Sequence, residues 1–349
     1  MAIKDASKID KNFSIQKNVL REGLTYFNAE EFSVHGVQKI DGLFRRMEYD
    51  TAQKVSNQVG AISSECAGGR VRFITNSPYI AISVKYKSVS KVPNYSFSAT
   101  IGFDLYSGTR YVGCFVPPID TLESLESVLD LPEDLANGLH EYTINFPVCS
   151  EISELLIGIK DDCQISKASA YTISKPIVFY GSSVTQGACA SRPGNTYANM
   201  ISRDLDCDYI NLGFWGNAKG EEEMARYISN LEMSAFIYDY DYNSPSAEHL
   251  ESTHENMFKI IRERNPALPI IILSAPKYYL SKTDKARVAI IENTYQNALA
   301  SGDKFVKFIP GQTMLAPVKD IALADNIHPN DIGFRSMANF IENALKEFL

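Results

Sequence analysis

The sequence predicts a chain in two parts, with an antiparallel β-sandwich over residues 1–174 and an α/β domain over residues 175–349. Two observations support this division. Residues 1 to about 170 contain short β-rich runs, several of which alternate apolar with polar side chains. From residue 177 onward, apolar strand-like runs alternate with longer helical patterns, which is typical of a parallel sheet covered by helices.

The predicted strands of the first part are short, and turn residues such as Gly68-Gly69 separate them. They cover residues 71–75, 79–86, 95–100, 109–116, 141–146 and 154–159. Alternation places one face of such a strand in a core, as expected for two packed antiparallel sheets. Residues 26–47 fit either an edge strand or a covering loop.

The second part predicts a three-layer α/β/α arrangement around a central parallel sheet. Its predicted strands cover residues 177–180, 209–212, 235–240, 269–274 and 305–309. Its predicted helices cover residues 196–205, 221–231, 247–264, 284–300 and 331–348. Ligands of such sheets bind beyond the carboxyl ends of the strands, so the loops after the strands are expected to carry the site. The boundary between the two parts is expected near Ser174-Lys175-Pro176.

Composition narrows the class of protein. With 349 residues, 45% of them hydrophobic and 22% charged, the chain resembles an ordinary globular protein with a sizeable core. A net charge of -8 without a basic tract predicts that neither nucleic acid nor an anionic membrane is a partner. No apolar run approaches the ~20 residues of a membrane span.

The N-terminus is polar and lacks the apolar core of a secretory signal. The six cysteines are scattered without CxxC spacing, as expected for reduced thiols. A cytoplasmic location is therefore the expectation, and removal of a signal peptide from the given sequence stays open.

Two distant segments carry the chemistry that the sequence indicates. The strand-like run 177–181 is followed by Ser182 and Ser183, while Asp325 and His328 lie three residues apart ahead of the last predicted helix. Together they supply a nucleophile, a base and a group that orients the base, the three parts needed to activate a serine hydroxyl for acyl transfer. Taken separately, the serines fit a helix cap, and the Asp–His pair fits a turn that bonds helix-end amides.

Two further loops carry hydrogen-bond donors. Gly216 follows the predicted strand 209–212, and Asn243 follows the predicted strand 235–240. The backbone N–H of Gly216 and the side-chain amide of Asn243 are expected to donate to an oxyanion beside Ser183, where losing one donor typically costs about 10²–10³ in rate. A tight turn at Gly216 and a helix N-cap at Asn243 are the structural alternatives.

Four short blocks of the second part resemble, in order and rough spacing, those of the SGNH (GDSL-type) esterases and lipases: Gly181-Ser182-Ser183, Gly216, Asn243 and Asp325-x-x-His328. The resemblance implies a flavodoxin-like catalytic domain with Ser183 as nucleophile, His328 as base and Asp325 as its orienter. Ser182 then stands where most members carry aspartate. The resemblance also implies an oxyanion hole made by the backbone N–H groups of Ser183 and Gly216 and the Asn243 amide.

The first part adds a second resemblance. Gly102-Phe103-Asp104-Leu105-Tyr106 is similar to the GxDLY element of a jelly-roll-like β-sandwich domain that precedes SGNH domains in one subgroup. That subgroup includes carbohydrate deacetylases, acetyl-xylan esterase-like proteins and at least one acyltransferase. The resemblance implies a serine esterase that hydrolyses short-chain, acetyl-type esters on a carbohydrate. An acyltransferase, or a carbohydrate-binding protein with an inert hydrolase domain, is the alternative.

Three residues are candidates for substrate contact. Trp215, the only tryptophan, fits a wall of the acyl pocket, a platform for a sugar ring or a core filler. Tyr278 fits a lining of the same crevice, and Arg192 fits either a contact to substrate oxygens or a surface salt bridge. His249 and His254 are five residues apart on a predicted helix, which separates their faces. No metal or cofactor is expected, and the expected partner is a small-molecule or oligosaccharide ester.

The role of the first part stays open at this stage. Residues 1–170 fit a glycan-binding module, a source of one loop for the active site, or the interface of a homo-oligomer. No catalytic residue is placed there.

Overall fold

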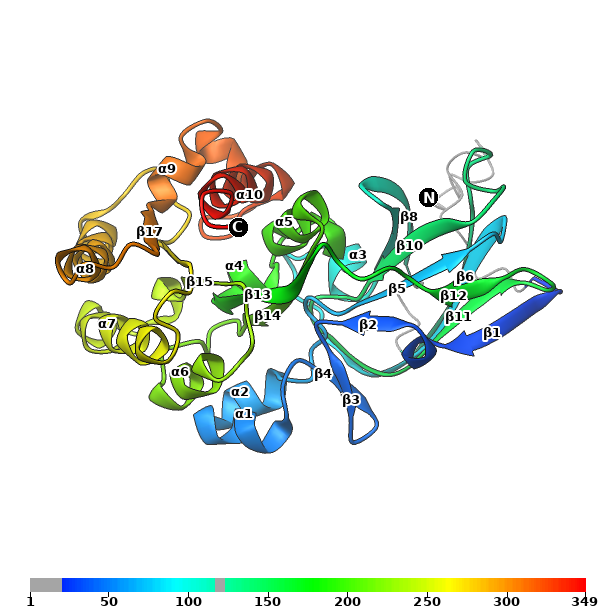
Figure 1. Ribbon diagram of the computed structural model, residues 1–349, viewed down its shortest axis with the longest axis horizontal. Coiled ribbons are helices and arrows are strands. Elements are labelled where there is room, and N and C mark those ends of the chain that lie inside the picture. Colours follow the sequence, from blue (N-terminus) through cyan, green and yellow to red (C-terminus); the bar gives the residue numbers. More distant parts are fainter. Residues whose placement is uncertain (1–20, 117–122) are drawn as a thin grey trace, which may run out of the picture.

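The computed structural model describes residues 21–116 and 123–349, which form two lobes side by side (Figure 1). The first half of the chain builds antiparallel sheets, and the second half builds a five-stranded parallel sheet flanked by helices. The predicted fold class is therefore confirmed. Residues 1–20, on which the expectation about a signal peptide rests, lie outside the described residues.

Two antiparallel sheets make the sandwich lobe. One has the strand order β1-β11-β6-β9, and the other has the order β12-β5-β10-β7-β8 with β2 paired to β5. The bounds of the first sheet are β1 (Leu24–Asn28), β11 (Ser150–Lys160), β6 (Tyr79–Val89) and β9 (Ser124–Asp130). Those of the second are β12 (Ile165–Lys167), β5 (Arg70–Thr75), β10 (His140–Asn145), β7 (Phe103–Ser107), β8 (Arg110–Phe115) and β2 (Ser33–His35).

Alternating side chains explain how the two sheets share one core. In β9, Leu125 and Leu129 are buried while Glu126 between them is exposed. The same core takes Phe73 from β5 and Ile157 from β11. Each strand thus contributes one apolar face, as a sandwich requires.

The first half differs from the prediction in several places. The strands β7, β9 and β12 were not among the predicted strands. Residues 95–100 were expected as a strand, but they contain the single helical turn α3 (Phe97–Thr100). The backbone N–H groups of Ala99 and Thr100 both donate to the Ser96 carbonyl, at 3.0 Å each, and the Thr100 hydroxyl bonds the same carbonyl. Local hydrogen bonds from serine and threonine segments of this kind compete with strand pairing.

The segment 26–47 is neither one edge strand nor one loop. It runs through β1, the 3₁₀ turn η3 (Ala29–Glu31), β2 and the hairpin β3 (Gln38–Ile40)–β4 (Leu43–Arg45). Two short helices follow, α1 (Tyr49–Val55) and α2 (Asn57–Ile62). Their Ala52 and Val59 are fully buried in the core of the α/β lobe, so this part of the first half belongs to the packing of the second.

The α/β lobe has the parallel strand order β14-β13-β15-β16-β17. Its strands are β13 (Ile173–Gly181), β14 (Cys207–Gly213), β15 (Ala235–Asp239), β16 (Ile270–Leu273) and β17 (Val306–Ile309). Its helices are α4 (Ser183–Gln186), α5 (Tyr197–Leu205), α6 (Glu222–Ser229), α7 (Ala247–Arg264), α8 (Lys282–Ala300), α9 (Gly311–Leu315) and α10 (Asp331–Leu345). Single 3₁₀ turns are η4 (Pro193–Asn195), η5 (Asp241–Asn243) and η6 (Lys319–Ala322).

Helices cover both faces of this sheet. Buried residues of α6, α7 and α8 form one core with the sheet, and buried residues of α5, α9 and α10 form the other. The three predicted layers are present. β13 begins at Ile173, upstream of the boundary expected at residues 174–176, and its register with β14 shifts before Ile177. The division of the chain at residue 174 stays a prediction.

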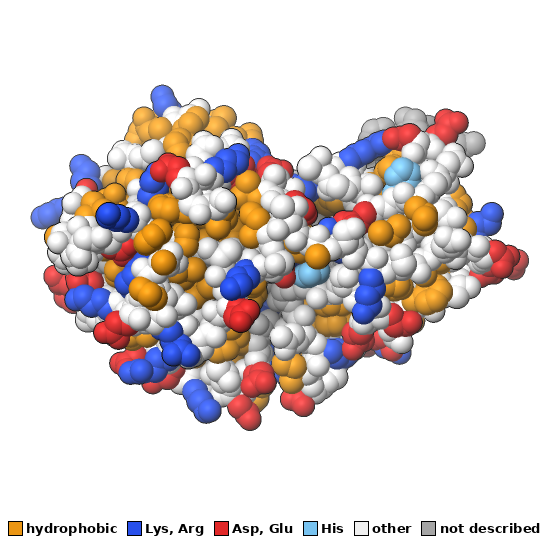
Figure 2. Space-filling view, viewed as in Figure 1, with side chains coloured by type: hydrophobic (Ala, Val, Ile, Leu, Met, Phe, Trp, Pro, Cys, Tyr) orange, Lys and Arg blue, Asp and Glu red, His pale blue; other side chains and the backbone are white. Residues whose placement is uncertain are grey.

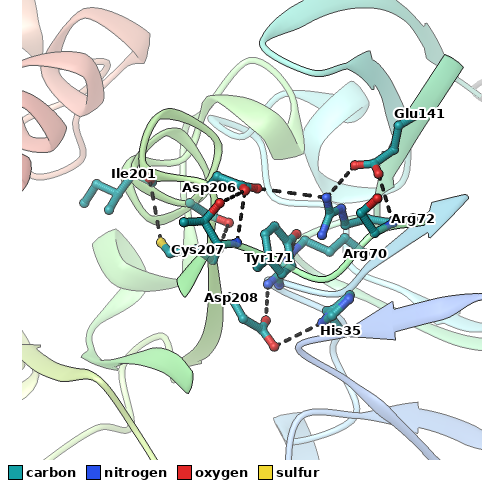
Figure 3. A network of polar contacts seen from close by, with 12 residues as sticks. His35, Arg70, Arg72, Glu141, Tyr171, Ile201, Asp206, Cys207 and Asp208 are labelled. Carbon is teal, nitrogen blue, oxygen red and sulfur yellow. Dashed lines mark hydrogen bonds and ion pairs between the residues drawn. The ribbon is translucent and has the colours of Figure 1, made fainter. Parts of the chain in front are cut away.

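A network of buried polar contacts joins the two lobes (Figure 3). Arg70 of β5 is 1% exposed, pairs with Asp208 at the start of β14 and donates from Nε to the Tyr171 hydroxyl at 2.8 Å. His35 bonds the other oxygen of Asp208 at 3.0 Å. The guanidinium of Arg72 lies 3.8 Å from the centre of the Tyr171 ring. The lobes are therefore fixed to each other at the amino end of β14, which leaves the carboxyl ends of the strands for a site.

A cavity of about 260 Å³ lies beside this network, and its lining includes none of the predicted site residues. Acidic and basic side chains are interspersed over the face of the molecule shown in Figure 2. Among the described helices, none combines the length and the apolar composition needed to cross a bilayer.

Candidate active site

The turn after β13 separates the two serines that the sequence singles out. Ser182 is the N-cap of α4, fully buried, and its Oγ accepts a hydrogen bond from the Val184 N–H at 3.2 Å. Ser183 is the first helical residue and is partly exposed. Its Oγ lies 2.8 Å from Nε2 of His328. Ser182 therefore serves the cap, and Ser183 faces the imidazole.

The turn is tight because a buried carboxyl group lies against it. A Cβ at Gly181 would overlap Oδ1 of Asp239 and Oγ1 of Thr185, so only glycine fits there. The Asp239 carboxyl accepts hydrogen bonds from the Thr185 hydroxyl and the Ser182 N–H. Burial raises the pKa of Asp239 to about 8 despite these bonds, and the neighbouring Asp241 carboxyl raises it further.

His328 and Asp325 form the second half of the arrangement. Nδ1 of His328 lies 2.8 Å from Oδ2 of Asp325, while the backbone N–H groups of His328 and Ile327 each donate to Oδ1 at 2.7 Å. Burial raises the pKa of Asp325, but these hydrogen bonds outweigh it and lower the pKa to about 2. The carboxylate is thus ionised and fixes the ring with Nε2 toward Ser183, a geometry that can remove the proton of a serine hydroxyl.

The loops that carry Gly216 and Asn243 leave the same edge of the sheet as the Ser183 turn, because β14, β13 and β15 are neighbours. Gly216 has a φ of +70°, and a methyl group there would meet no described atom within 4 Å. Nδ2 of Asn243 donates to the Phe214 carbonyl at 3.0 Å, and an amide carries a second N–H. The N-cap of α7 is Ser246, so Asn243 is not that cap.

Trp215 lies on the surface of this loop and not in the core, since the residue is 41% exposed. Its ring N–H donates to Oε2 of Glu65 at 3.0 Å, and its backbone N–H donates to Oε1 of Gln186 at 3.1 Å. Nε2 of Gln186 donates to the same oxygen of Glu65 at 2.6 Å. Burial raises the pKa of Glu65, and Arg46 together with these hydrogen bonds partly offsets the rise.

A loop of the sandwich lobe reaches the other side of the site. Nδ2 of Asn94 donates to Oδ2 of Asp325 at 2.6 Å, and the Tyr95 ring meets the His328 ring edge-on with centroids 5.6 Å apart. Glu65, Asn94 and Tyr95 were not predicted from the sequence, where no residue of the first half was placed at the site. Of the three roles left open for that half, the structure supports the one in which it lends a loop.

The remaining candidates lie apart from these contacts. The guanidinium of Arg192 stacks on Tyr111 at 4.0 Å, donates to the Tyr106 hydroxyl at 3.3 Å and lies 3.5 Å from the Asp104 carboxylate. Arg192 thus contacts the GxDLY segment of the sandwich. The ring of Tyr278 packs edge-on against a neighbouring tyrosine at 4.9 Å. Among the described residues, neither of them makes a hydrogen bond, ion pair or ring contact with Ser183 or His328, and their binding of substrate stays a prediction.

One group of side chains offers donor atoms for a metal. Sγ of Cys189 and ligand atoms of Asp325 and His328 lie within 4.8 Å of one another. Burial raises the pKa of the Cys189 thiol to about 12, and the other two residues bond each other. Metal binding there would therefore require the Cys189 thiol to lose its proton. The expectation that no metal or cofactor is used stays a prediction.

Comparison with known proteins places the chain. Residues 174–346 match the GDSL-like Lipase/Acylhydrolase family, and residues 24–165 match GxDLY, the N-terminus of Esterase_SGNH_hydro-type proteins. The chain belongs to the SGNH/GDSL-like hydrolases with an N-terminal GxDLY domain. The predicted family is confirmed, and at this level the protein is an SGNH esterase-like hydrolase.

Solved structures resemble the chain over nearly its whole length. A GDSL-like lipase from Bacteroides ovatus, described as putative, is 27% identical, with 93% of this chain and 98% of that chain covered and a TM-score of 0.84. The salicylyl-acyltransferase SsfX3 of a tetracycline biosynthetic pathway is 19% identical (94% and 98% covered, TM-score 0.74). The acetyl xylan esterase Est2A from Butyrivibrio proteoclasticus is 14% identical (93% and 98% covered, TM-score 0.61). No curated protein matches the sequence.

Proposed function

We propose that this SGNH hydrolase is a serine esterase that hydrolyses short-chain esters, acetyl above all, on a carbohydrate. The observation that carries the proposal is the hydrogen-bonded series from Ser183 Oγ to His328 Nε2 and from His328 Nδ1 to Asp325, with 2.8 Å at each step. Membership of an acylhydrolase family supports ester chemistry. The likeness of fold to an acetyl xylan esterase supports a carbohydrate as the alcohol half of the ester.

The proposed acylation begins when Ser183 Oγ attacks the ester carbonyl and His328 Nε2 takes the hydroxyl proton. The C–O bond formed leaves a tetrahedral oxyanion, which accepts hydrogen bonds from the N–H groups of Ser183 and Gly216 and from the Asn243 amide. Collapse of this intermediate breaks the bond to the alcohol, and His328 returns its proton to the leaving oxygen. Asp325 stabilises the imidazolium between these steps.

Deacylation repeats the sequence with water as the nucleophile. His328 removes a proton from water, the hydroxide oxygen attacks the acyl carbon, and Ser183 Oγ leaves with that proton. The free acid and the serine hydroxyl are restored, so no further reactant is needed.

Trp215 supports the short acyl chain. Its ring N–H bonds Glu65 and its backbone N–H bonds Gln186, yet the residue is 41% exposed. A rigid, exposed aromatic face next to Gly216 is suited to wall an acyl pocket or to receive a sugar ring.

Replacing Ser183 by alanine tests the proposal. Hydrolysis of p-nitrophenyl acetate, butyrate and octanoate is expected to favour acetate, and Ser183→Ala is expected to lower kcat by on the order of 10⁶. Ser182→Ala is the matched control, since that hydroxyl serves the helix cap, and it should keep substantial activity. Full activity of Ser183→Ala, or loss of activity only in Ser182→Ala, would refute the assignment of the nucleophile.

Acyl transfer to a second alcohol is the alternative, favoured by the likeness to the salicylyl-acyltransferase. Both reactions pass through the same acyl-enzyme, so the acceptor decides between them. Acetylated xylo-oligosaccharide or another acetyl ester is incubated with the protein in the presence of a competing alcohol. Product analysis then shows whether the acetyl group is released as free acetate or transferred to the alcohol as a new ester. A carbohydrate-binding protein with an inert hydrolase domain would show sugar binding and no turnover at all.

A further inference from the structure

We propose that Asn94 is a positioning residue of the active site, which holds the Asp325 carboxylate in place from the sandwich lobe. The proposal deepens the proposed function and rests on it. Asn94 lies 231 residues before Asp325 in the sequence, and its Nδ2 donates to Asp325 Oδ2 at 2.6 Å.

Asp325 accepts hydrogen bonds from its own turn and from Asn94. Oδ1 accepts the N–H groups of Ile327 and His328, and Oδ2 accepts from the His328 ring. These three donors belong to the same short turn as the carboxylate, so they move with it. Asn94 is the donor from outside the turn among the described residues, and it therefore fixes the carboxylate relative to the rest of the molecule.

The turn needs such an anchor because it is open to solvent. Ile327 is 43% exposed, and the Asp325 side chain is 28% exposed. Water competes for a carboxylate at this exposure and permits its rotation. A second donor on Oδ2 keeps that oxygen directed at Nδ1 of His328, where it stabilises the imidazolium formed as Ser183 attacks.

The segment that carries Asn94 is itself fixed to residues 189–191 of the α/β lobe. The Asn94 carbonyl accepts a hydrogen bond from Cys189 Sγ at 3.3 Å, and the Ser96 hydroxyl donates to the Ser191 carbonyl at 2.8 Å. Tyr95 between them packs its ring on His328. An amide suits this role since its N–H donors are present at every pH.

Variants of Asn94 test the proposal through the rate constant for labelling of Ser183 by a fluorophosphonate, which needs no knowledge of the natural ester. Asn94→Ala is expected to lower this rate about tenfold, the effect of losing one hydrogen bond to a charged group. Asn94→Asp is expected to shift the acid limb of the pH–rate profile to higher pH, because a second carboxylate beside Asp325 favours the protonated imidazole.

Asn137 supplies the matched control. It is an exposed asparagine of the same lobe, and its Nδ2 donates to the Glu133 carbonyl. Asn137→Ala and Asn137→Asp should leave both the rate and the acid limb unchanged. A purely structural role of Asn94 would lower the melting temperature of Asn94→Ala without moving the ¹H NMR signal of the ring N–H shared by His328 and Asp325. Asn94→Asp keeps the shape of the side chain if Asn94→Ala fails to fold.

The outcomes separate this inference from the proposed function. The inference about Asn94 is overturned, and the proposed function is kept, if the wild type is labelled and both folded Asn94 variants show unchanged rates and acid limbs. Absence of labelling in the wild type overturns the proposed function. In that case the ¹H NMR signal of the ring N–H shared by His328 and Asp325 tests the role of Asn94. Asn94→Ala should shift this signal, and an unmoved signal would contradict the contact between Asn94 and Asp325.

Discussion

Asp239 is a carboxyl group buried beneath the Ser183 turn, and burial raises its pKa to about 8. The unfolded value is about 3.8, so between these values the folded state holds a proton that the unfolded state has released. The contribution of the Asp239 proton to the free energy of unfolding is complete below about pH 4 and is lost as the pH rises through 8. The wild type should therefore lose stability over this range through Asp239.

Asp239→Asn should remove that dependence, because the amide keeps an acceptor for Thr185 without an ionisable group. The free energy of unfolding of Asp239→Asn, measured in urea and taken relative to the wild type, should rise by more than about 1 kcal/mol between about pH 5 and about pH 8. Asp162→Asn, at an exposed turn, is the control with no expected gain. A constant difference between Asp239→Asn and wild type at both pH values would refute the raised pKa.

Single residues also show how far sequence reasoning reaches. Ser183, Asp325 and His328 were predicted together because each stands in a short local pattern at the end of a strand or before a helix, and the structure brings them into contact. Asn94 and Glu65 carry no such pattern. Their contacts span 231 and 121 residues, to Asp325 and Gln186, and exist only once the lobes are packed.

At the scale of elements, the loop after β14 depends on the positive φ of Gly216. Gly216→Ala should cost about 1 kcal/mol, since an L-residue is strained at +70° even where its methyl group meets nothing. It should also lower kcat by displacing the backbone N–H proposed for the oxyanion hole.

Gly302→Ala is the matched control for this variant. Gly302 has a φ of +87° and equally open surroundings among the described atoms, but it lies after α8. Both variants should lose similar stability in urea unfolding, and only Gly216→Ala should lose turnover. Equal kcat values in the two variants would contradict a catalytic role of the Gly216 loop.

Elements of the two lobes were unequally predictable. The parallel strands are continuous apolar runs buried on both sides, and their predicted positions agree with β13 to β17. The helices α1 and α2 were missed, since they have seven and six residues and depend on burial of Ala52 and Val59 against the other lobe. The strand predicted at residues 95–100 was wrong for a related reason, as local hydrogen bonds decide that turn.

At the scale of the whole molecule, the two lobes meet at both ends of the parallel sheet. The ion pair of buried Arg70 with Asp208 joins them at the amino end of β14, and Asn94 meets Asp325 at the site. Arg70→Met should destabilise the protein by about 3 kcal/mol, because it leaves the partly buried Asp208 without its arginine. Arg110→Met breaks an exposed pair with Asp134 and should leave the stability nearly unchanged, because water and salt screen such a pair. Urea unfolding measures both, and equal losses would contradict the role of the Arg70 network.

We propose Ser183 as the nucleophile of a site to which both lobes contribute residues. The most direct test of this assignment is peptide mapping by mass spectrometry after reaction of the whole protein with a fluorophosphonate. A single covalent adduct on Ser183 is expected, which should be absent in Ser183→Ala and strongly reduced in His328→Ala. An adduct on another residue, or no adduct in folded wild-type protein, would contradict the assignment.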